Sequence, residues 1–489
     1  MSMNQPDNQS NGNTSLIFDP EAYSVLSLAA GDQTITARAY ENIVYVTKPV
    51  DIEHQVMNIY IPEAYFNGGT INGYLAETAP IFFPNAISQY RPATPLIPRF
   101  SKRTDLPNAS LVALTKGYVV VSPALRGHTS QDEDGHYVGK APACIIDMKA
   151  CVRYLRYNDK RMPGDTEKII PNGFSAGGAV SALLGASGNN PDYAPYLSEI
   201  GAAEERDDVF AVLCYCPVYN LENLDIGYEW NVKGVTKYGF RGEAPKELSA
   251  EQLKISNELC SLFPAYINNL DLKAFDHVNA ANSGHGKARS RLEAGTPLQL
   301  DANGEGTYKD FGKSLLIASA QKALDAGMDM SEYNWLSISP DGVVTDFDLD
   351  LYKKNNVSRM RPSPVFDDPA RSTAECLLFG TETVNSQHHT EHGLKYGSEG
   401  GSMADAYAIK LMNPLLYIDD PGSTAAKHWR IRHGTRDFGH MLTNPVILGA
   451  TLQNRGFDTD LAFAWEQGHA GDYDIDELFD WIESVCRQV

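Results

Sequence analysis

The amino-acid sequence predicts an α/β protein with a mostly parallel sheet, covered by helices on both faces and interrupted by one large insertion. Between residues 42 and 215, short runs rich in Val, Ile and Tyr alternate with helix-like segments, and the alternation resumes at residue 428. The stretch from about Tyr219 to about Asp405 is polar, helical and loop-rich, without such alternation. Strands that alternate with helices are typical of parallel sheets, because each crossover carries a helix back over the sheet. The middle stretch is therefore predicted to be an insertion that caps the sheet.

The elements of the first half follow from the spacing of apolar residues. A helix is expected over residues 141–159, where apolar side chains share one stripe with polar side chains at its margins. A short apolar strand over residues 168–173 precedes a helix of small residues. The remaining strands expected here are rich in β-branched and aromatic residues: 42–50, 55–65, 79–85, 117–127 and 208–218.

The insertion divides the chain into three predicted parts. Residues 1–15 form a disordered tail, residues 16–218 and 405–489 form the domain that contains the sheet, and residues 219–404 form a mainly helical inserted domain. Within the insertion, residues 246–270 and 313–330 have helical character. The chain then continues with expected strands and helices in alternation: 428–434, 443–456, 459–465 and the closing helix 473–489.

Composition restricts the partners of the protein. The formal net charge is −21 and the isoelectric point is near 5.0, so repulsion makes nucleic acid and anionic membranes unexpected partners. No apolar run approaches the roughly 20 residues that span a bilayer. The N-terminus lacks the basic start and apolar middle of a secretory signal. With seven scattered cysteines and no C-x-x-C pair, we expect reduced thiols and a cytoplasmic protein, unless a secretory leader precedes this sequence.

One serine lies between glycines in a pattern that predicts a nucleophile. The run Gly173-Phe174-Ser175-Ala176-Gly177 reads G-x-S-x-G, with a strand expected before it and a helix after it. Such a turn strains the serine backbone, presents its oxygen at the C-terminal edge of the sheet, and leaves no room for side chains at the two glycines. The backbone N–H of Ala176 would point at a developing oxyanion. The alternative is a glycine-rich structural bend.

A serine hydroxyl becomes a good nucleophile when a base accepts its proton, so a histidine and a carboxylate are needed. In the strand–turn–helix context, the chain order is Ser, then acid, then His. His469 lies in a loop after the last strand and fits the base, whereas His440 lies near the preceding strand and is expected to line the site. Asp437, which follows a strand end, is the acid candidate. Four other carboxylates compete for that role: Asp419, Asp420, Asp472 and Asp474.

A second oxyanion donor is expected from the loop that follows the 79–85 strand. The backbone N–H of Ser88 or of Gln89 is the best candidate in this loop. The loop contains no H-G-G-G run, which disfavours an esterase of the hormone-sensitive-lipase type.

Two weaker signals have ordinary alternatives. His388 and His392 lie four residues apart, as metal ligands on a helix can, but no glutamate occupies the zincin position. We therefore expect a solvated or site-lining face there, and neither a metal nor another cofactor. Arg126 and His128 follow an expected strand and either reach the cleft or form a hydrogen-bonded loop.

Several motifs together resemble the bacterial tannases of the lactic-acid-bacterium type, over about residues 16–486. The most specific are KHWRIRHG and H-x-G-D-Y-D, which generic hydrolases lack. The resemblance implies an α/β-hydrolase fold with a large, mainly helical lid inserted between the nucleophile half and the Asp/His half. It also implies cleavage of galloyl esters, with related members acting on other phenolic esters. The other motifs that carry it are TAPIFFPN, GYVVVSPALRGHTS, APACIIDMKACVRYLRYN, GFSAGGAVSALLGASGN and CPVYNLE…YEW.

The resemblance assigns Ser175, Asp437 and His469 to the family's nucleophile, acid and base. In that family a lysine and a glutamate from the lid, and an aspartate two places after the catalytic one, hold the ring hydroxyls. Arg361 stands at the lysine and Glu375 at the glutamate, but Gly439 stands at the aspartate, so one acceptor for a phenol hydroxyl is missing. The glycine pair of the family's oxyanion loop is likewise replaced, by Ser88 and Gln89.

The sequence therefore predicts a serine esterase that acts on phenolic esters through an acyl-enzyme. Galloyl and protocatechuoyl esters come first, and hydroxycinnamoyl esters such as ferulate follow because of Gly439. The alternatives are a prolyl-oligopeptidase-like peptidase and an inactive hydrolase fold that serves as a binding module. The alcohol moiety and the oligomeric state stay open.

Overall fold

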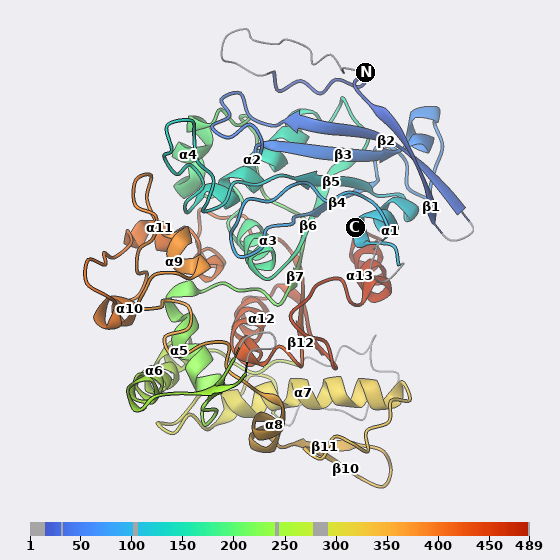
Figure 1. Ribbon diagram of the computed structural model, residues 1–489. Coiled ribbons are helices and arrows are strands. Elements are labelled where there is room, and N and C mark those ends of the chain that lie inside the picture. The colour runs from blue at the N-terminus through green and yellow to red at the C-terminus, as the bar shows by residue number, and fades with distance from the viewer. Residues whose placement is uncertain (1–14, 31–32, 101–105, 240–243, 277–291, 488–489) are drawn as a thin grey trace.

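The computed structural model describes residues 15–30, 33–100, 106–239, 244–276 and 292–487 (Figure 1). Its centre is a nine-stranded sheet with the strand order β1-β2-β3-β5-β4-β6-β7-β12-β13. The ladders from β5 to β13 are parallel and those that join β1, β2, β3 and β5 are antiparallel, which confirms the mostly parallel sheet. The strands are β1 (Ser24–Ala30), β2 (Gln33–Val44), β3 (Val56–Pro62), β4 (Pro80–Pro84), β5 (Val119–Pro123), β6 (Asp165–Phe174), β7 (Ala211–Tyr215), β12 (His428–Gly434) and β13 (Asp458–Ala464).

Helices enclose the sheet because its central strands are apolar on both faces. Every residue of β3, β4, β5 and β7 is buried, as expected for the central strands of a sheet between helical layers. Helices α2 and α3 pack together on one side of these strands, and α1 and α13 pack together on the other (Figure 1). The helices and short 3-10 turns around the sheet are η1 (Glu63–Asn67), α1 (Ala109–Thr115), α2 (Ala143–Tyr157), α3 (Ala176–Ala186), η2 (Pro191–Tyr193), α4 (Ala194–Glu199), α11 (Ala406–Lys410), η3 (Pro414–Leu416), η4 (Phe438–His440), α12 (Asn444–Asn454) and α13 (Ile475–Arg487).

The strand expected over residues 42–50 ends early, at Val44. Beyond it the backbone makes different contacts: the N–H groups of Thr47 and Lys48 donate to the carbonyls of Gly201 and Ile200, each at 3.0 Å. These bonds hold the segment against the end of α4 and away from the sheet ladder. The expectation was therefore wrong for most of this stretch.

The stretch between β7 and α11 contains the helices expected there and two small hairpins that were not expected. Helices α6 and α7 cover the predicted segments 246–270 and 313–330 with shifted ends. The elements of this stretch are α5 (Leu221–Asn231), β8 (Lys237–Tyr238), β9 (Lys246–Glu247), α6 (Ala250–Asn269), α7 (Thr307–Asp325), β10 (Leu336–Ile338), β11 (Val344–Phe347), α8 (Leu349–Asn356), α9 (Ala374–Leu378) and α10 (Glu391–Tyr396).

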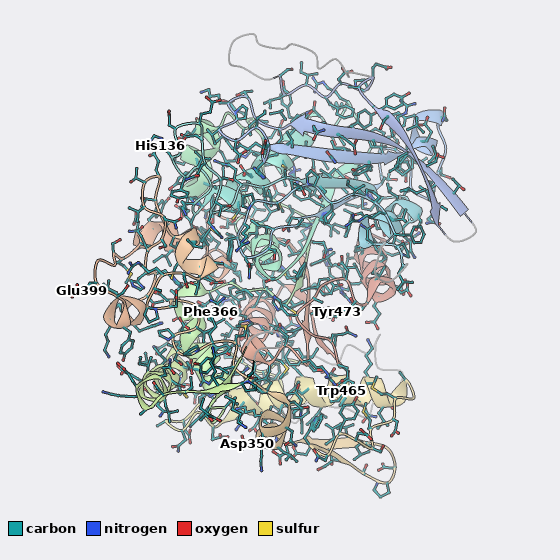
Figure 2. All side chains as sticks on the ribbon, viewed as in Figure 1. His136, Asp350, Phe366, Glu399, Trp465 and Tyr473 are labelled. Atoms are coloured by element: carbon teal, nitrogen blue, oxygen red, sulfur yellow. The ribbon has the colours of Figure 1, made fainter. Side chains whose placement is uncertain are left out.

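Side chains fill the space between this stretch and the sheet (Figure 2). Trp465, directly after β13, has its ring centroid 5.3 Å from that of Tyr333 and 6.4 Å from that of Phe347, both in the insertion. One continuous cluster of buried apolar residues runs through the sheet, its helices and the inserted helices. Among the described residues, no helix is both long enough and apolar enough to cross a membrane.

Candidate active site

The turn between β6 and α3 holds Ser175 in a strained conformation, with φ 58° and ψ −126°. Such angles cost a non-glycine residue roughly 1–3 kcal/mol and persist where the surroundings enforce them. The flanking glycines are required, because a Cβ at Gly173 would lie 2.4 Å from the carbonyl oxygen of Gly177. A Cβ at Gly177 would lie 2.6 Å from Oδ1 of Asn85. The tight turn that the motif predicts is therefore present.

Asn85, directly after the neighbouring strand β4, holds this turn in place through hydrogen bonds. Its buried amide nitrogen donates to the carbonyl oxygens of Asn172 and Gly177, at 3.1 and 3.2 Å, and lies 3.0 Å from Oγ of Ser181. The backbone N–H of Ser175 donates to the carbonyl of Tyr215 at 2.9 Å. Sequence reasoning missed Asn85, whose only signal is a polar residue that ends the apolar run FFPN.

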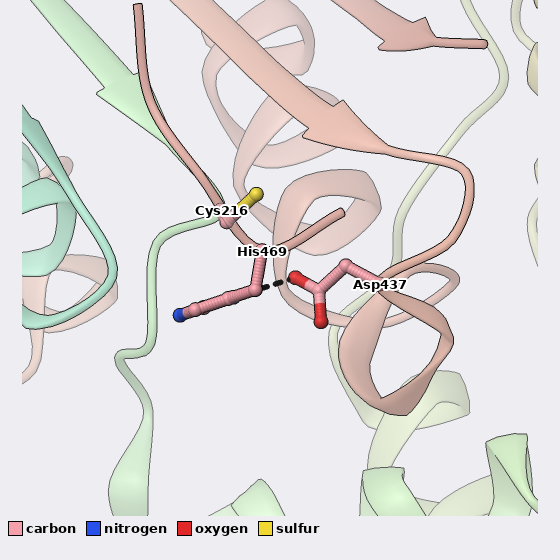
Figure 3. A group of neighbouring side chains, drawn as sticks. All are labelled: Cys216, Asp437 and His469. Carbon is pink, nitrogen blue, oxygen red and sulfur yellow. Dashed lines mark hydrogen bonds and ion pairs between the residues drawn. The ribbon is translucent and has the colours of Figure 1, made fainter. Parts of the chain in front are cut away.

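Asp437 and His469 form a hydrogen-bonded pair at the same edge of the sheet (Figure 3). Nδ1 of His469 lies 2.7 Å from Oδ2 of Asp437. Asp437 follows the end of β12, and His469 lies in the loop between β13 and α13. Because β6, β7, β12 and β13 are parallel neighbours, their carboxyl ends bring these loops to the serine turn.

The loop of His469 lies directly against the residue that precedes Ser175. A Cβ at Gly471 would lie 2.9 Å from Cβ of Phe174, and the ring centroids of Phe174 and His469 are 6.3 Å apart. Within the described residues, no hydrogen bond joins Ser175 to His469. Catalytic hydrogen bonds are often loose in the absence of substrate.

A second histidine contacts Asp437. Nε2 of His433, on β12, lies 2.9 Å from the main-chain oxygen of Asp437 and 3.1 Å from its Oδ2. The His433 side chain is fully buried, so this contact fixes the carboxylate from the side opposite to solvent. Sequence reasoning missed His433 because a histidine in a strand-like run gives no signal of what it touches.

The electrostatics of the pair favour its charged form. Burial alone would raise the pKa of the Asp437 carboxyl, but His433 and His469 outweigh burial and lower that pKa well below its ordinary value. Burial acts on His469 in the opposite sense, lowering its pKa, and Asp437 outweighs it, so the pKa of His469 is raised. A carboxylate that stabilises a protonated imidazole in this way is what a general base needs in its partner.

The candidate oxyanion donors come from two neighbouring segments. Ala176 is the first residue of α3, so its N–H belongs to the free helix N-terminus. The loop of Ser88 and Gln89 forms a tight turn, in which Gln89 has φ 52° and the N–H of Arg91 donates to the carbonyl of Ser88 at 3.0 Å. A Cβ at Gly177 would lie 3.0 Å from the carbonyl oxygen of Ile87, so this loop lies against the start of α3. Which loop N–H completes the site stays a prediction.

Glu375 and Arg361 interact electrostatically in the inserted stretch. Glu375, on α9, is partly buried, and burial raises its pKa to about 7, while Arg361 acts to lower it. A carboxyl group with such a pKa is present both as acid and as carboxylate at neutral pH. Arg361 itself is exposed.

His440 and Gly439 lie in η4, next to the acid. The ring of His440 is buried, 6.4 Å from that of His469, and burial lowers its pKa to about 4, so it is neutral at physiological pH. The rings of Phe366 and Tyr228 lie 5.3 and 6.2 Å from it and form an aromatic wall. At Gly439 an added Cβ would lie only 2.9 Å from Cε2 of Tyr228, so the Tyr228 ring fills the space where a side chain would begin.

The two histidines with metal-like spacing do not converge. Nδ1 of His388 lies 2.6 Å from Asp367, whereas Nε2 of His392 lies 3.4 Å from Asp225. Arg126 likewise has a structural role, because its guanidinium forms a buried ion pair with Asp147 at 2.8 Å.

The strained serine turn and the adjacent pair of His469 and Asp437 lie at the carboxyl edge of a parallel sheet, which is the arrangement typical of an α/β-hydrolase. A family model described as BD-FAE matches residues 101–237. The tannase of Fusobacterium nucleatum is 42% identical over 96% of this chain and 99% of its own, with a TM-score of 0.88. The tannin acyl hydrolase of Lactobacillus plantarum is 39% identical over the same shares, also with a TM-score of 0.88. The chain belongs to the bacterial tannase family.

Further comparisons are consistent with this class. A tannin acyl hydrolase solved in complex with ethyl gallate is 40% identical over 96% of this chain and 99% of its own, with a TM-score of 0.88. The Esterase LipC of Mycobacterium tuberculosis is 40% identical over 58 residues, which span only 12% of this chain and 14% of that protein. These matches are to esterases, so the peptidase alternative finds no support in them.

Proposed function

We propose that this protein is a serine esterase that hydrolyses phenolic esters, with Ser175, Asp437 and His469 as its catalytic triad. The observation that carries the proposal is the 2.7 Å contact between His469 and Asp437. The loop that contains His469 packs against the strained serine turn. Support for the substrate class comes from tannin acyl hydrolases solved with ethyl gallate and with 3,4-dihydroxybenzoate, each 40% identical to this chain.

The reaction proceeds in two steps. His469, in its neutral form, accepts the hydroxyl proton of Ser175 through Nε2, and the serine oxygen attacks the ester carbonyl to form a tetrahedral oxyanion. The N–H of Ala176 and one N–H from the loop of Ser88 and Gln89 stabilise this charge. His469 then gives the proton to the leaving alcohol, and the acyl group stays on the serine. A water molecule, deprotonated by the same imidazole, attacks the acyl-enzyme and releases the aromatic acid.

Asp437 orients His469 and stabilises its protonated form during both steps. His433 acts through Asp437 as a positioning residue, because its Nε2 contacts both the side chain and the main chain of the acid. With two histidines on one carboxylate, the acid has little freedom to rotate away from His469.

The acyl ring is recognised by groups from the insertion and from η4. Glu375, with its pKa near 7, can accept a hydrogen bond from a phenol hydroxyl or donate one, and Arg361 supplies positive charge nearby. His440 and the aromatic wall border the acid–base pair. Gly439 offers no acceptor, and the Tyr228 ring occupies its space. The site therefore forms fewer hydrogen bonds with the ring hydroxyls. Hydroxycinnamate esters, which have fewer such hydroxyls than gallate, are therefore accepted as substrates together with gallate and protocatechuate esters.

A panel of methyl esters of gallate, protocatechuate, ferulate and caffeate tests the proposal, together with the variant Ser175→Ala. We expect wild-type turnover of at least one of these esters and a loss of roughly 10⁴-fold or more in kcat for Ser175→Ala on all of them. A fluorophosphonate should label the wild type at Ser175 and leave the variant unlabelled. Turnover near the wild-type rate in the variant would exclude Ser175 as the nucleophile, and the absence of labelling in the wild type would favour the inactive binding module.

A further inference from the structure

Cys216 differs from the other cysteines in its place and its backbone. All seven are unpaired and buried. Cys216 directly follows β7, at the edge of the sheet where the triad residues lie, and has φ 43°. Glycine adopts this conformation without cost, whereas another residue is strained there, and such residues gather at functional sites. The esterase reaction proposed above makes no use of a thiol.

The thiol of Cys216 lies against the acid–base pair. Its Sγ is 3.6 Å from the carbonyl oxygen of Ala470, the neighbour of His469. This sulfur, a ring nitrogen of His469 and a carboxylate oxygen of Asp437 all lie within 4.8 Å of one another. In Figure 3 the far nitrogen of the His469 ring points away from both the thiol and the carboxylate. The nitrogen that faces them is therefore Nδ1, which contacts Asp437.

We propose that Cys216, His469 and Asp437 form an inhibitory site for one soft divalent metal ion of the Zn²⁺ or Cd²⁺ type. Thiolate, imidazole and carboxylate are the ligands that Zn²⁺ prefers, at about 2.0–2.3 Å. A tetrahedral ion with such bonds separates its ligand atoms by roughly 3.3–3.8 Å. The thiol therefore needs to approach the other two ligands by up to about one ångström. Nδ1 of His469 and Oδ2 of Asp437, now 2.7 Å apart, need instead to separate by roughly 0.6–1.1 Å, and water fills the fourth position. On binding, the thiol proton and the Nδ1 proton leave to solvent.

A metal ion at this place stops the proposed reaction by a direct route. It takes the position of the hydrogen bond between His469 and Asp437, so the imidazole loses the carboxylate that supports its protonated form. The positive ion also draws electron density from the ring, which makes Nε2 a weaker base toward Ser175. The ion reaches the cluster past His469, whose side chain is 37% exposed.

A second cluster of metal-binding residue types serves as an internal comparison. Asp367, Cys376 and His389 also bring ligand atoms within 4.8 Å of one another. The Asp437 carboxylate has two histidine contacts, whereas that of Asp367 has four: His388 and the Thr390 hydroxyl, each at 2.6 Å, and the backbone N–H groups of His389 and Thr390 at 2.9 Å. A metal ion would have to break these bonds, so we expect no binding there.

The inference rests on the proposed triad, and calorimetry with ZnCl₂ on the full-length protein tests it independently of any ester. We expect one Zn²⁺ per wild-type chain and an affinity at least about tenfold weaker in Cys216→Ala. Cys214→Ala is the matched control, because Cys214 is equally buried two residues earlier on β7. It should bind as the wild type does, and so should Cys376→Ala. Cd²⁺ should add an ultraviolet thiolate absorption to the wild type and to Cys214→Ala, and none to Cys216→Ala.

Inhibition is measured as the fraction of each variant's own metal-free rate, and as the rate of fluorophosphonate labelling. Zn²⁺ should slow both in proportion to occupancy, a chelator should reverse the effect, and Cys216→Ala should need at least about tenfold more Zn²⁺. Equal Zn²⁺ affinity in Cys216→Ala and wild type would overturn the site, as would loss of binding in Cys376→Ala. Zn²⁺ bound at Cys216 without slower labelling would refute the inhibitory role. An enzyme that turns over no phenolic ester but shows the expected calorimetry would contradict the proposed function alone.

Discussion

Glu375 is the residue whose surroundings best suit it to recognising a phenolic ring. Burial raises its pKa to about 7, and Arg361 is near enough to oppose that rise. A carboxyl group that is partly buried and close to a cation gains most from a ligand that supplies hydrogen bonds, because those bonds replace lost hydration. Glu375 therefore carries a prediction about selectivity and another about pH.

Replacement of Glu375 by alanine should separate phenolic from simple esters. A hydrogen bond to a charged group is worth about 1.5–3 kcal/mol, so kcat/KM for methyl gallate should fall roughly 10- to 150-fold, with little change for an acetate ester. The variant Glu382→Ala is the control, since that carboxylate belongs to the same insertion and its side chain is 71% exposed. Equal losses on both esters would show that Glu375 does not contact the ring.

The ionisation of Glu375 should appear in the pH dependence of KM. Below pH of about 7 the group is mostly protonated, and above it the carboxylate is the stronger acceptor for a phenol hydroxyl. We therefore expect KM for phenolic esters to fall as pH rises through about 7, and this step to be absent in Glu375→Gln. Steady-state kinetics between about pH 5 and pH 8 provide the measurement, because a group with such a pKa changes its ionisation within this range. A KM step that persists in the glutamine variant would assign the titration to another group.

Residues of the site differ in how far sequence reveals them. Ser175 is predictable because its turn needs glycines at fixed positions, and chain order together with a place after a strand end favours His469 and Asp437. Asn85 and His433 hold these groups in place through contacts across strands, and such contacts depend on which strands are neighbours in the sheet. The residue pattern within one strand does not indicate which strand lies beside it, so these contacts cannot be predicted from the sequence.

Among the elements, the buried core strands were predictable, whereas the exposed edge strand and the very short strands were not. Strands β3, β4, β5 and β7 are buried on both faces, so each appears in the sequence as a run of apolar residues. Strand β1 forms the edge of the sheet and has exposed positions, which weakens the pattern. The hairpins β8–β9 and β10–β11 have two to four residues per strand, too few for a period to show.

The element η4 shows how a short turn sets the chemistry of the site. It carries Gly439 and His440 directly after Asp437, and helix α5 supplies Tyr228 against the glycine. The Tyr228 hydroxyl accepts the N–H of Met360 at 3.0 Å, so the ring is held in place. A side chain at position 439 would therefore need the Tyr228 ring on α5 to move.

At the scale of the whole molecule, strand order explains why distant residues meet. The sheet places β6, β7, β12 and β13 side by side although the insertion separates β7 from β12 in the sequence. The insertion therefore begins at the carboxyl end of β7, the edge that carries the triad candidates, and the chain crosses to the opposite edge before it enters the parallel strand β12. The division into residues 16–218 with 405–489 and an inserted lid over 219–404 stays a prediction. Whether the two parts unfold separately depends on whether they share one apolar core.

The shared core predicts that both parts unfold together. The apolar cluster is continuous through the sheet and the inserted helices, and the buried hydroxyl of Tyr308 on α7 donates to the carbonyl of Leu442 at 2.8 Å. Calorimetry should therefore show one transition, with equal calorimetric and van't Hoff enthalpies. Tyr308→Phe removes a buried hydrogen bond worth about 1 kcal/mol and should shift the whole transition to lower temperature. Two resolved transitions, of which Tyr308→Phe moves only one, would instead establish the lid as a unit that unfolds separately.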